Sequence, residues 1–126
     1  MLTGNPETAV KEFFRLFNTG DGDAVMAMYE PRAVFVERSG QVVQGAANLR
    51  TALNRLLSLK PTLTVNHSRI LVAGDLALSI VRWSLTGTGS DAKPVYMEGT
   101  TSDVLRRQGD GTWLFVIDNP WGAGIL

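Results

Sequence analysis

Asp103 and Asp118 are the residues whose type and placement best suit acid/base chemistry in this chain. They lie in two apolar runs joined by Gly109-Asp110-Gly111, and Asp-Gly favours a tight turn between paired strands. A two-residue loop at Gly109-Asp110 or at Asp110-Gly111 puts both aspartates on one face of this hairpin, because side chains alternate along a strand. Burial and a neighbouring carboxylate both favour the protonated form. We therefore expect the pair to keep a proton at neutral pH and to titrate in two coupled steps.

The length of the turn decides whether the two aspartates meet. A three-residue loop at Gly109-Asp110-Gly111 would flip one strand, send Asp118 outward and leave Asp103 alone among apolar neighbours. Asp118 would then serve the bend at Asn119-Pro120, which is an ordinary role for an aspartate in a turn. The sequence leaves both alternatives open.

Apolar residues occupy both faces of the predicted hairpin. Alternation from a two-residue loop places three of them beside the aspartates and four on the opposite face: Leu105, Leu114 and Val116 against Val104, Trp113, Phe115 and Ile117. We expect helices to cover the first face. The second would leave an apolar patch exposed to water, so the sequence predicts a homodimer through the outer face of the sheet.

Composition excludes several classes of function. The 126 residues suit a single globular domain over 1–126, and Lys+Arg and Asp+Glu both number 12, so no net charge favours nucleic acid or a membrane surface. Cysteine is absent and His67 is the only histidine, so we expect no disulfide, no metal site and no cofactor. The opening residues resemble no secretory leader and no apolar run could span a membrane, which predicts a cytoplasmic protein.

The helices and strands predicted for the rest of the chain must position these acids. Apolar spacing, caps and prolines predict helices over about 5–20, 21–30 and 45–60, the last two ended by Pro31 and Pro61. Strands are expected over about 33–37, 41–44, 62–73 and 76–86, before the terminal hairpin opens near Val95. This order predicts an α+β domain: a cone-shaped, strongly curved, mostly antiparallel sheet wrapped around three helices of the N-terminal half, enclosing an apolar pocket.

Three segments carry a family likeness: residues 17–23, which read FNTGDGD, residues 28–37, which read MYEPRAVFVE, and residues 102–113, which read SDVLRRQGDGTW. In them the chain resembles the SnoaL-like and ketosteroid-isomerase-like proteins of the nuclear-transport-factor-two-like superfamily. The resemblance implies that Glu37 is a proton-shuttling carboxylate and that Asp103 is a protonated acid donating to an oxyanion. Phe13 stands where ketosteroid isomerases have an oxyanion tyrosine, and one missing donor can cost roughly 10²–10³ in rate.

The predicted function is that of a cofactor-independent acid/base enzyme, of isomerase, cyclase or dehydratase type, acting on a small hydrophobic carbonyl compound. Glu37 and Asp103 would be catalytic, and seven residues would line the ligand pocket: Phe13, Phe17, Tyr29, Trp83, Met97, Asp118 and Trp121. The alternative for Glu37 is a surface ion pair with Arg32 or Arg38. The alternative for the whole chain is a non-catalytic ligand-binding or dimerisation domain.

Overall fold

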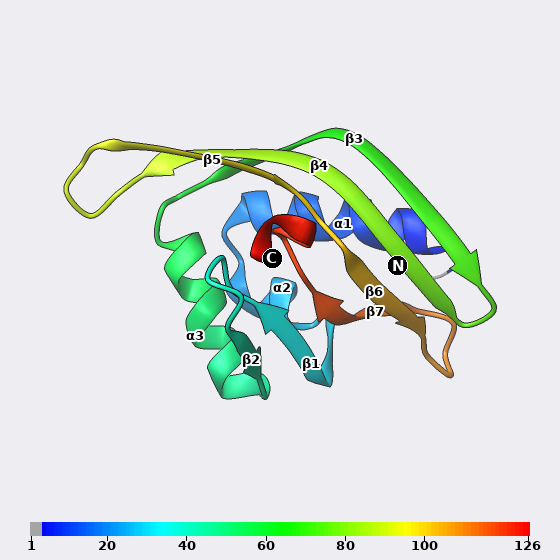
Figure 1. The fold of residues 1–126 in the computed structure, drawn as a ribbon. Helices are drawn as coiled ribbons and strands as arrows, with labels where there is room; N and C mark the ends of the chain where they lie inside the picture. The colour runs from blue at the N-terminus through cyan, green and yellow to red at the C-terminus, as the bar shows by residue number, and fades with distance from the viewer. Residues whose placement is uncertain (1–3) are drawn as a thin grey trace.

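A computed structural model describes residues 4–126 and has an α+β architecture (Figure 1). Its helices are α1 (Pro6–Thr19), α2 (Gly22–Met26) and α3 (Ala46–Leu57), with a final 3-10 turn, η1 (Gly122–Ile125). Its strands are β1 (Tyr29–Val36), β2 (Val42–Gln44), β3 (Thr62–Ala73), β4 (Leu76–Thr88), β5 (Pro94–Thr100), β6 (Asp103–Arg107) and β7 (Trp113–Asp118). No helix in this part of the chain is long and apolar enough to cross a membrane.

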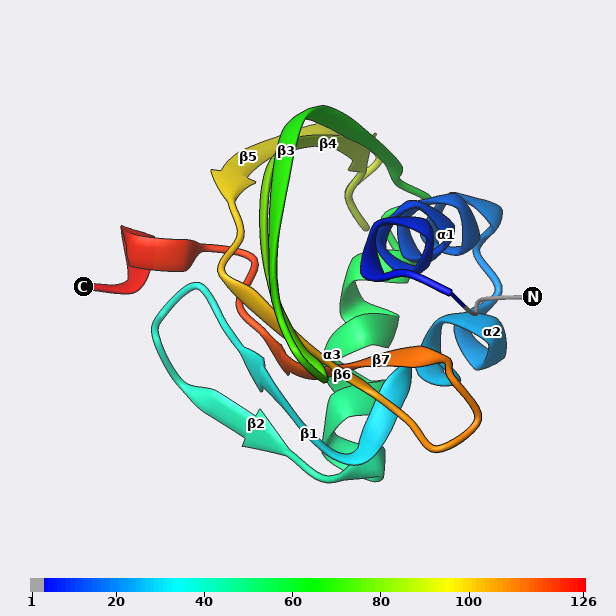
Figure 2. The same ribbon diagram turned by 90° about the vertical axis from the view of Figure 1, so that its right-hand side faces the viewer.

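The strands form one curved, open sheet in the order β2-β1-β7-β6-β4-β3, and β5 pairs with β4 beyond the end of β6. All pairings are antiparallel except that of β1 with β7, so the sheet is mixed. Figure 2 shows the sheet curling so that α1 and α3 lie inside its concave side. The predicted curved, mostly antiparallel sheet around three helices is confirmed.

α1 buries one apolar face against the sheet. Asn5 caps it by accepting a hydrogen bond from the Thr8 N–H at 2.8 Å, and Pro6 occupies the first turn, as the sequence predicts. The face that turns inward carries Ala9, Val10, Phe13, Phe14 and Phe17, all of them buried. This helix therefore supplies the aromatic wall that the pocket needs.

The second helix is shorter than predicted, and this changes the position of Tyr29. α2 ends at Met26, and β1 already begins at Tyr29, so Pro31 lies within the strand instead of ending a helix. The register of β1 on β7 shifts between Tyr29 and Val34, so Pro31, which has no N–H to donate, falls where the pairing is interrupted. Tyr29 is thereby placed opposite Phe115 of β7.

The terminal hairpin is shorter than expected and has a three-residue loop. Residues 99–100 belong to β5, and β6 starts only at Asp103. The Gln108 N–H donates to the Thr112 carbonyl across Gly109-Asp110-Gly111, and Gly111 has a φ of 88° that suits glycine.

A β-bulge in β7 reverses the effect of that loop on Asp118. Val104 pairs with Ile117 and Leu105 with Phe115, so Val116 has no partner on β6. The extra residue returns Asp118 to the concave side, where it is buried together with Asp103.

Two of the four residues predicted for the outer face of the hairpin lie inside it. Trp113 and Phe115 are 3% and 1% exposed and belong to the core, so their predicted outward placement was wrong. The three-residue loop explains the error, because it shifts the alternation of β7 by one residue up to the bulge. Val104 and Ile117 do face outward, opposite each other.

Candidate active site

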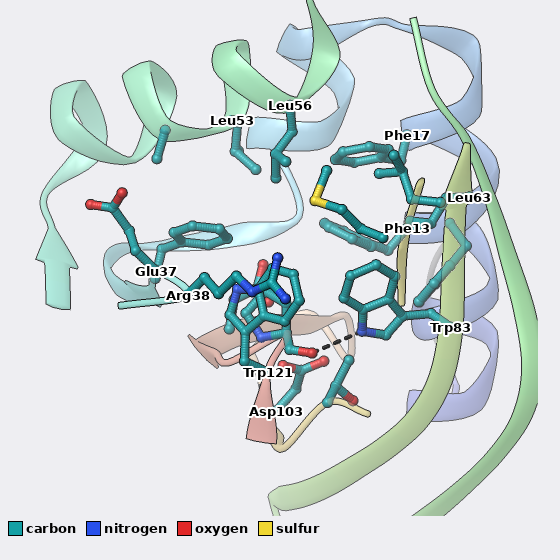
Figure 3. A pocket seen from close by; sticks show the side chains of 18 of the residues that line it. Phe13, Phe17, Glu37, Arg38, Leu53, Leu56, Leu63, Trp83, Asp103 and Trp121 are labelled. Carbon is teal, nitrogen blue, oxygen red and sulfur yellow. Dashed lines mark hydrogen bonds between the residues drawn. The ribbon is translucent and has the colours of Figure 1, made fainter. Parts of the chain in front are cut away.

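A cavity of about 270 Å³ lies between α1, α3 and the concave side of the sheet (Figure 3). Its wall is almost entirely apolar, and it includes Phe13 and Phe17 of α1, Leu53 and Leu56 of α3, and Trp83 of β4. Asp103 and Asp118 line the same cavity, although they are only 4% and 6% exposed. Two carboxyls thus meet an otherwise hydrophobic space, which is where acids acquire unusual proton affinity.

The structure brings together eight of the nine residues singled out from the sequence. Those that line the cavity are Phe13, Phe17, Glu37, Trp83, Met97, Asp103, Asp118 and Trp121. Tyr29 is the exception, because it lies behind Asp118 and is not among the lining residues. In the structure its hydroxyl contacts Asp118, and its contact with a ligand stays a prediction.

Asp103, Asp118 and Tyr29 form a buried hydrogen-bonded network. The Tyr29 hydroxyl donates to Oδ2 of Asp118 at 2.5 Å, and the backbone N–H of Asn119 donates to Oδ1 of Asp103 at 2.8 Å. A hydrogen bond between the two carboxyls links Asp103 to Asp118. β1, β6 and β7 each supply one side chain, so the network depends on the parallel pairing of β1 with β7.

This network favours one shared proton at neutral pH. Burial raises the pKa of Asp103 well above its ordinary value, and the charge of Asp118 raises it further. Burial also raises the pKa of Asp118, to about 6, against the lowering effect of the hydrogen bonds from Tyr29 and Asp103. Burial and the charge of Asp118 raise the pKa of Tyr29, which keeps its hydroxyl protonated as a donor. Asp103 therefore carries the proton, and Asp118 carries the charge.

Glu37 lies at the rim of the cavity, not at its floor. Oε2 of its half-buried carboxylate lies 3.7 Å from a guanidinium nitrogen of Arg55 on α3. The alternative considered from the sequence was an ion pair with Arg32 or Arg38 instead. Figure 3 shows Glu37 on the α3 side of the pocket, with its carboxylate turned away from Asp103. The acids predicted to be catalytic therefore sit at opposite ends of the cavity.

The turn after β7 holds Trp121 over the pocket. The Asn119 side-chain oxygen accepts the backbone N–H groups of Trp121 at 3.2 Å and Gly122 at 3.1 Å. The indole N–H of Trp83 donates to the carbonyl of Pro120 at 2.8 Å (Figure 3). Asn119 was expected only as a bend residue, and the Asn-Pro pair was the one signal of its role. In residues 4–126, no three His, Asp or Glu side chains gather as ligands for a metal ion.

The chain is similar to proteins of known family and structure. The family model of a SnoaL-like domain matches residues 10–118, and a search of the curated proteins found no match. A nuclear transport factor 2-like superfamily protein from Salmonella enterica has a TM-score of 0.80 at 17% identity, over 90% of this chain and 85% of that chain. A candidate dehydratase of that family from Streptomyces avermitilis has a TM-score of 0.78 at 15% identity, over 90% of both chains.

A candidate ketosteroid isomerase from Shewanella frigidimarina has a TM-score of 0.71 at 23% identity, over 87% of this chain and 89% of that chain. At these identities the solved structures establish a common fold and nothing further about chemistry.

Proposed function

Because the chain belongs to the SnoaL-like domain family, we propose that it is a cofactor-independent acid/base enzyme acting on a small hydrophobic carbonyl compound. Isomerisation, cyclisation and dehydration all fit, because each moves a proton close to a carbonyl group. A candidate isomerase and a candidate dehydratase share this fold, so the fold can accommodate this class of reaction.

The observation that carries the proposal is a pair of buried aspartates, Asp103 and Asp118, at the end of an apolar cavity, where burial raises the pKa of both. A substrate carbonyl oxygen that reaches Asp103 would receive a hydrogen bond from its protonated carboxyl as negative charge develops. Asp118 would lose the hydrogen bond from Asp103 but keep the one from Tyr29. The network can therefore release its proton toward the substrate without leaving Asp118 unpartnered.

Glu37 is the proposed general base at the other end of the cavity. It would take a proton from the carbon next to the carbonyl, in a substrate that spans the space from rim to floor. The 3.7 Å separation from Arg55 leaves its carboxylate only loosely paired. A modest side-chain rotation would turn it toward the cavity.

A second candidate is a ligand-binding domain without catalysis. Phe13 favours it, because its ring lines the cavity at the place where the resemblance implies a hydroxyl donor. In that case the aspartates would only orient a bound hydrophobe.

Exchange of carbonyl α-protons with solvent tests the enzyme directly. 2-Tetralone in heavy water, followed by proton NMR, should exchange faster with the wild type than with buffer. Glu37→Gln and Asp103→Asn should each slow the protein-dependent rate by about 10²-fold, since each removes a proton-transfer group. Asp91→Asn, on the exposed loop between β4 and β5, is the matched control and should keep the wild-type rate.

The binding domain is the better account if wild-type protein binds 2-tetralone without accelerating exchange. Tryptophan fluorescence reports that binding, because Trp83 and Trp121 both line the cavity.

We further propose that the protein is a homodimer through the outer face of its sheet. Register places five apolar residues in one row across neighbouring strands: Leu71, Leu78, Val104, Ile117 and Val34. Leu71, Leu78 and Ile117 are 45%, 37% and 38% exposed, which is a large apolar area to leave in water. This row replaces the patch predicted from the sequence, in which Trp113 and Phe115 were counted.

Leu78→Lys should convert the dimer to a monomer, because it places a charge inside this row, between Leu71 and Val104. Sedimentation at micromolar concentration measures the change. Val42→Lys on β2, which is also exposed but lies outside the row, should leave the dimer intact. A wild-type monomer at that concentration would contradict the proposal.

Two expectations stay predictions from the sequence. One is the cytoplasmic location. The other is a single domain over 1–126, of which the family model covers residues 10–118.

A further inference from the structure

Charge is distributed unevenly along the cavity. Its floor carries Asp103 and Asp118, which together hold a negative charge near neutral pH. Its rim carries Glu37, Arg38 and Arg55, and the Glu37 carboxylate faces Arg55. The space between is lined mainly by aromatic and aliphatic side chains. The cavity thus has an acidic end, an apolar middle and one cation at the rim that Glu37 does not neutralise.

Arg38 is that cation, and it is held in position by an aromatic ring. Its guanidinium carbon lies 4.9 Å from the ring centre of Trp121, as expected for a cation–π contact. Figure 3 shows its guanidinium reaching across Trp121 at the mouth of the pocket. Among residues 4–126, no carboxylate lies within ion-pair distance of it.

The position of Trp121 is fixed from a different part of the chain. Asn119 accepts the N–H groups of residues 121 and 122, so the turn after β7 sets where the indole lies. Arg38 lies two residues after the end of β1. Two segments about eighty residues apart therefore combine to hold one guanidinium over the pocket, with its N–H edge available to a planar anion.

We propose, on the basis of the function proposed above, that the substrate is a hydrophobic carbonyl compound bearing a carboxylate or similar anionic group, which Arg38 binds at the rim. The apolar body of such a molecule fills the cavity, and its carbonyl end points to Asp103. The reverse orientation is unfavourable because it places an anion against the charge of Asp118 in a buried site. Arg38 is thus a specificity residue that sets which end of the substrate meets the acids.

The matched pair 1-naphthaleneacetate and 1-naphthaleneacetamide tests this inference by binding alone. The two probes share a ring system and a similar shape, and they differ in charge. Calorimetry with the wild type should show the acid binding about tenfold more tightly than the amide, because only the acid forms a charge-assisted contact with Arg38. Screening by solvent at this exposed site keeps the difference from being larger. The preference should shrink as salt concentration rises.

Arg38→Gln should abolish the preference while keeping the affinity for the amide. Arg32→Gln, an exposed arginine on β1 that does not line the cavity, is the matched control and should retain it. Melting temperatures of both variants establish that they are folded. Equal binding of acid and amide by the wild type would overturn the inference, as would a preference that survives in Arg38→Gln.

These outcomes are independent of the proposed catalysis. If 2-tetralone exchange is absent but the acid preference depends on Arg38, the enzyme proposal fails and the anion site stands. If exchange is fast but the wild type does not prefer the acid, the anion site at Arg38 fails and the enzyme proposal stands.

Discussion

Asp118→Asn is expected to make the protein more stable than the wild type at about pH 8, by up to about 3 kcal/mol, and no more stable at about pH 4. The reason is the folded-state pKa of Asp118, which burial raises from 3.8 to about 6. Between those values the native wild type binds more protons than the unfolded chain, so its stability falls as pH rises. Asparagine removes this effect because it carries no charge, and its side-chain oxygen can still accept the hydrogen bond from the Tyr29 hydroxyl.

Urea unfolding of both proteins across this pH range measures the effect. Asp110→Asn is a control of opposite sign, because hydrogen bonds from Thr112 lower the pKa of Asp110 at an exposed position. The wild-type carboxylate at 110 stabilises the fold above its unfolded pKa, so this variant should be slightly less stable at high pH. An Asp118→Asn variant that gains nothing at about pH 8 would contradict a raised pKa for Asp118 in the folded protein.

The sequence predicted that Asp103 and Asp118 lie on one face of the hairpin, but for the wrong reason, because a wrong loop length was offset by a bulge that was not predicted. Alternation from a two-residue loop placed Asp103 and Asp118 on one face, and the structure has a three-residue loop. The bulge at Val116 restores the outcome for Asp118 but not for Trp113 and Phe115, which precede it. The bulge depends on how the whole sheet curves, and no residue pattern within this strand predicts it.

Local signals were reliable where local interactions decide the structure. The cap at Asn5, the helical spacing of the phenylalanines and the order of elements predicted α1 and the curved sheet. Tyr29 shows the limit of such signals. Its hydroxyl meets Asp118 across 89 positions of sequence, through a parallel pairing of strands that periodicity alone does not reveal.

Glu37 illustrates a second limit. The resemblance gives the strand and position of this acid, and the structure puts it at the cavity as expected. The direction of its carboxylate depends on Arg55, which belongs to a different element and was not singled out from the sequence. Side-chain partners between elements are set by packing, so a family likeness predicts where an acid is more readily than what it faces.

Gly122→Ala is expected to release the turn that closes the pocket, at a cost on the order of 3 kcal/mol. Gly122 has a φ of 52°, and a methyl group there would overlap the carbonyl oxygen of Thr100 in the backbone. The backbone cannot yield easily, because Thr100 ends β5 where it pairs with Arg82 of β4. The turn from Asn119 must therefore move away instead, taking Trp121 with it.

Gly111→Ala separates the effect of backbone strain from that of the overlap. Gly111 also has a positive φ, of 88°, but nothing lies within 4 Å of the position a methyl group would take. This control should cost only about 1 kcal/mol, the price of a left-handed conformation in alanine. Trp121 loses its position over the cavity in Gly122→Ala alone, so that variant should show red-shifted tryptophan emission and weakened binding of 1-naphthaleneacetate. Equal unfolding costs in the two variants, with unchanged emission, would show that the turn does not hold Trp121 over the pocket.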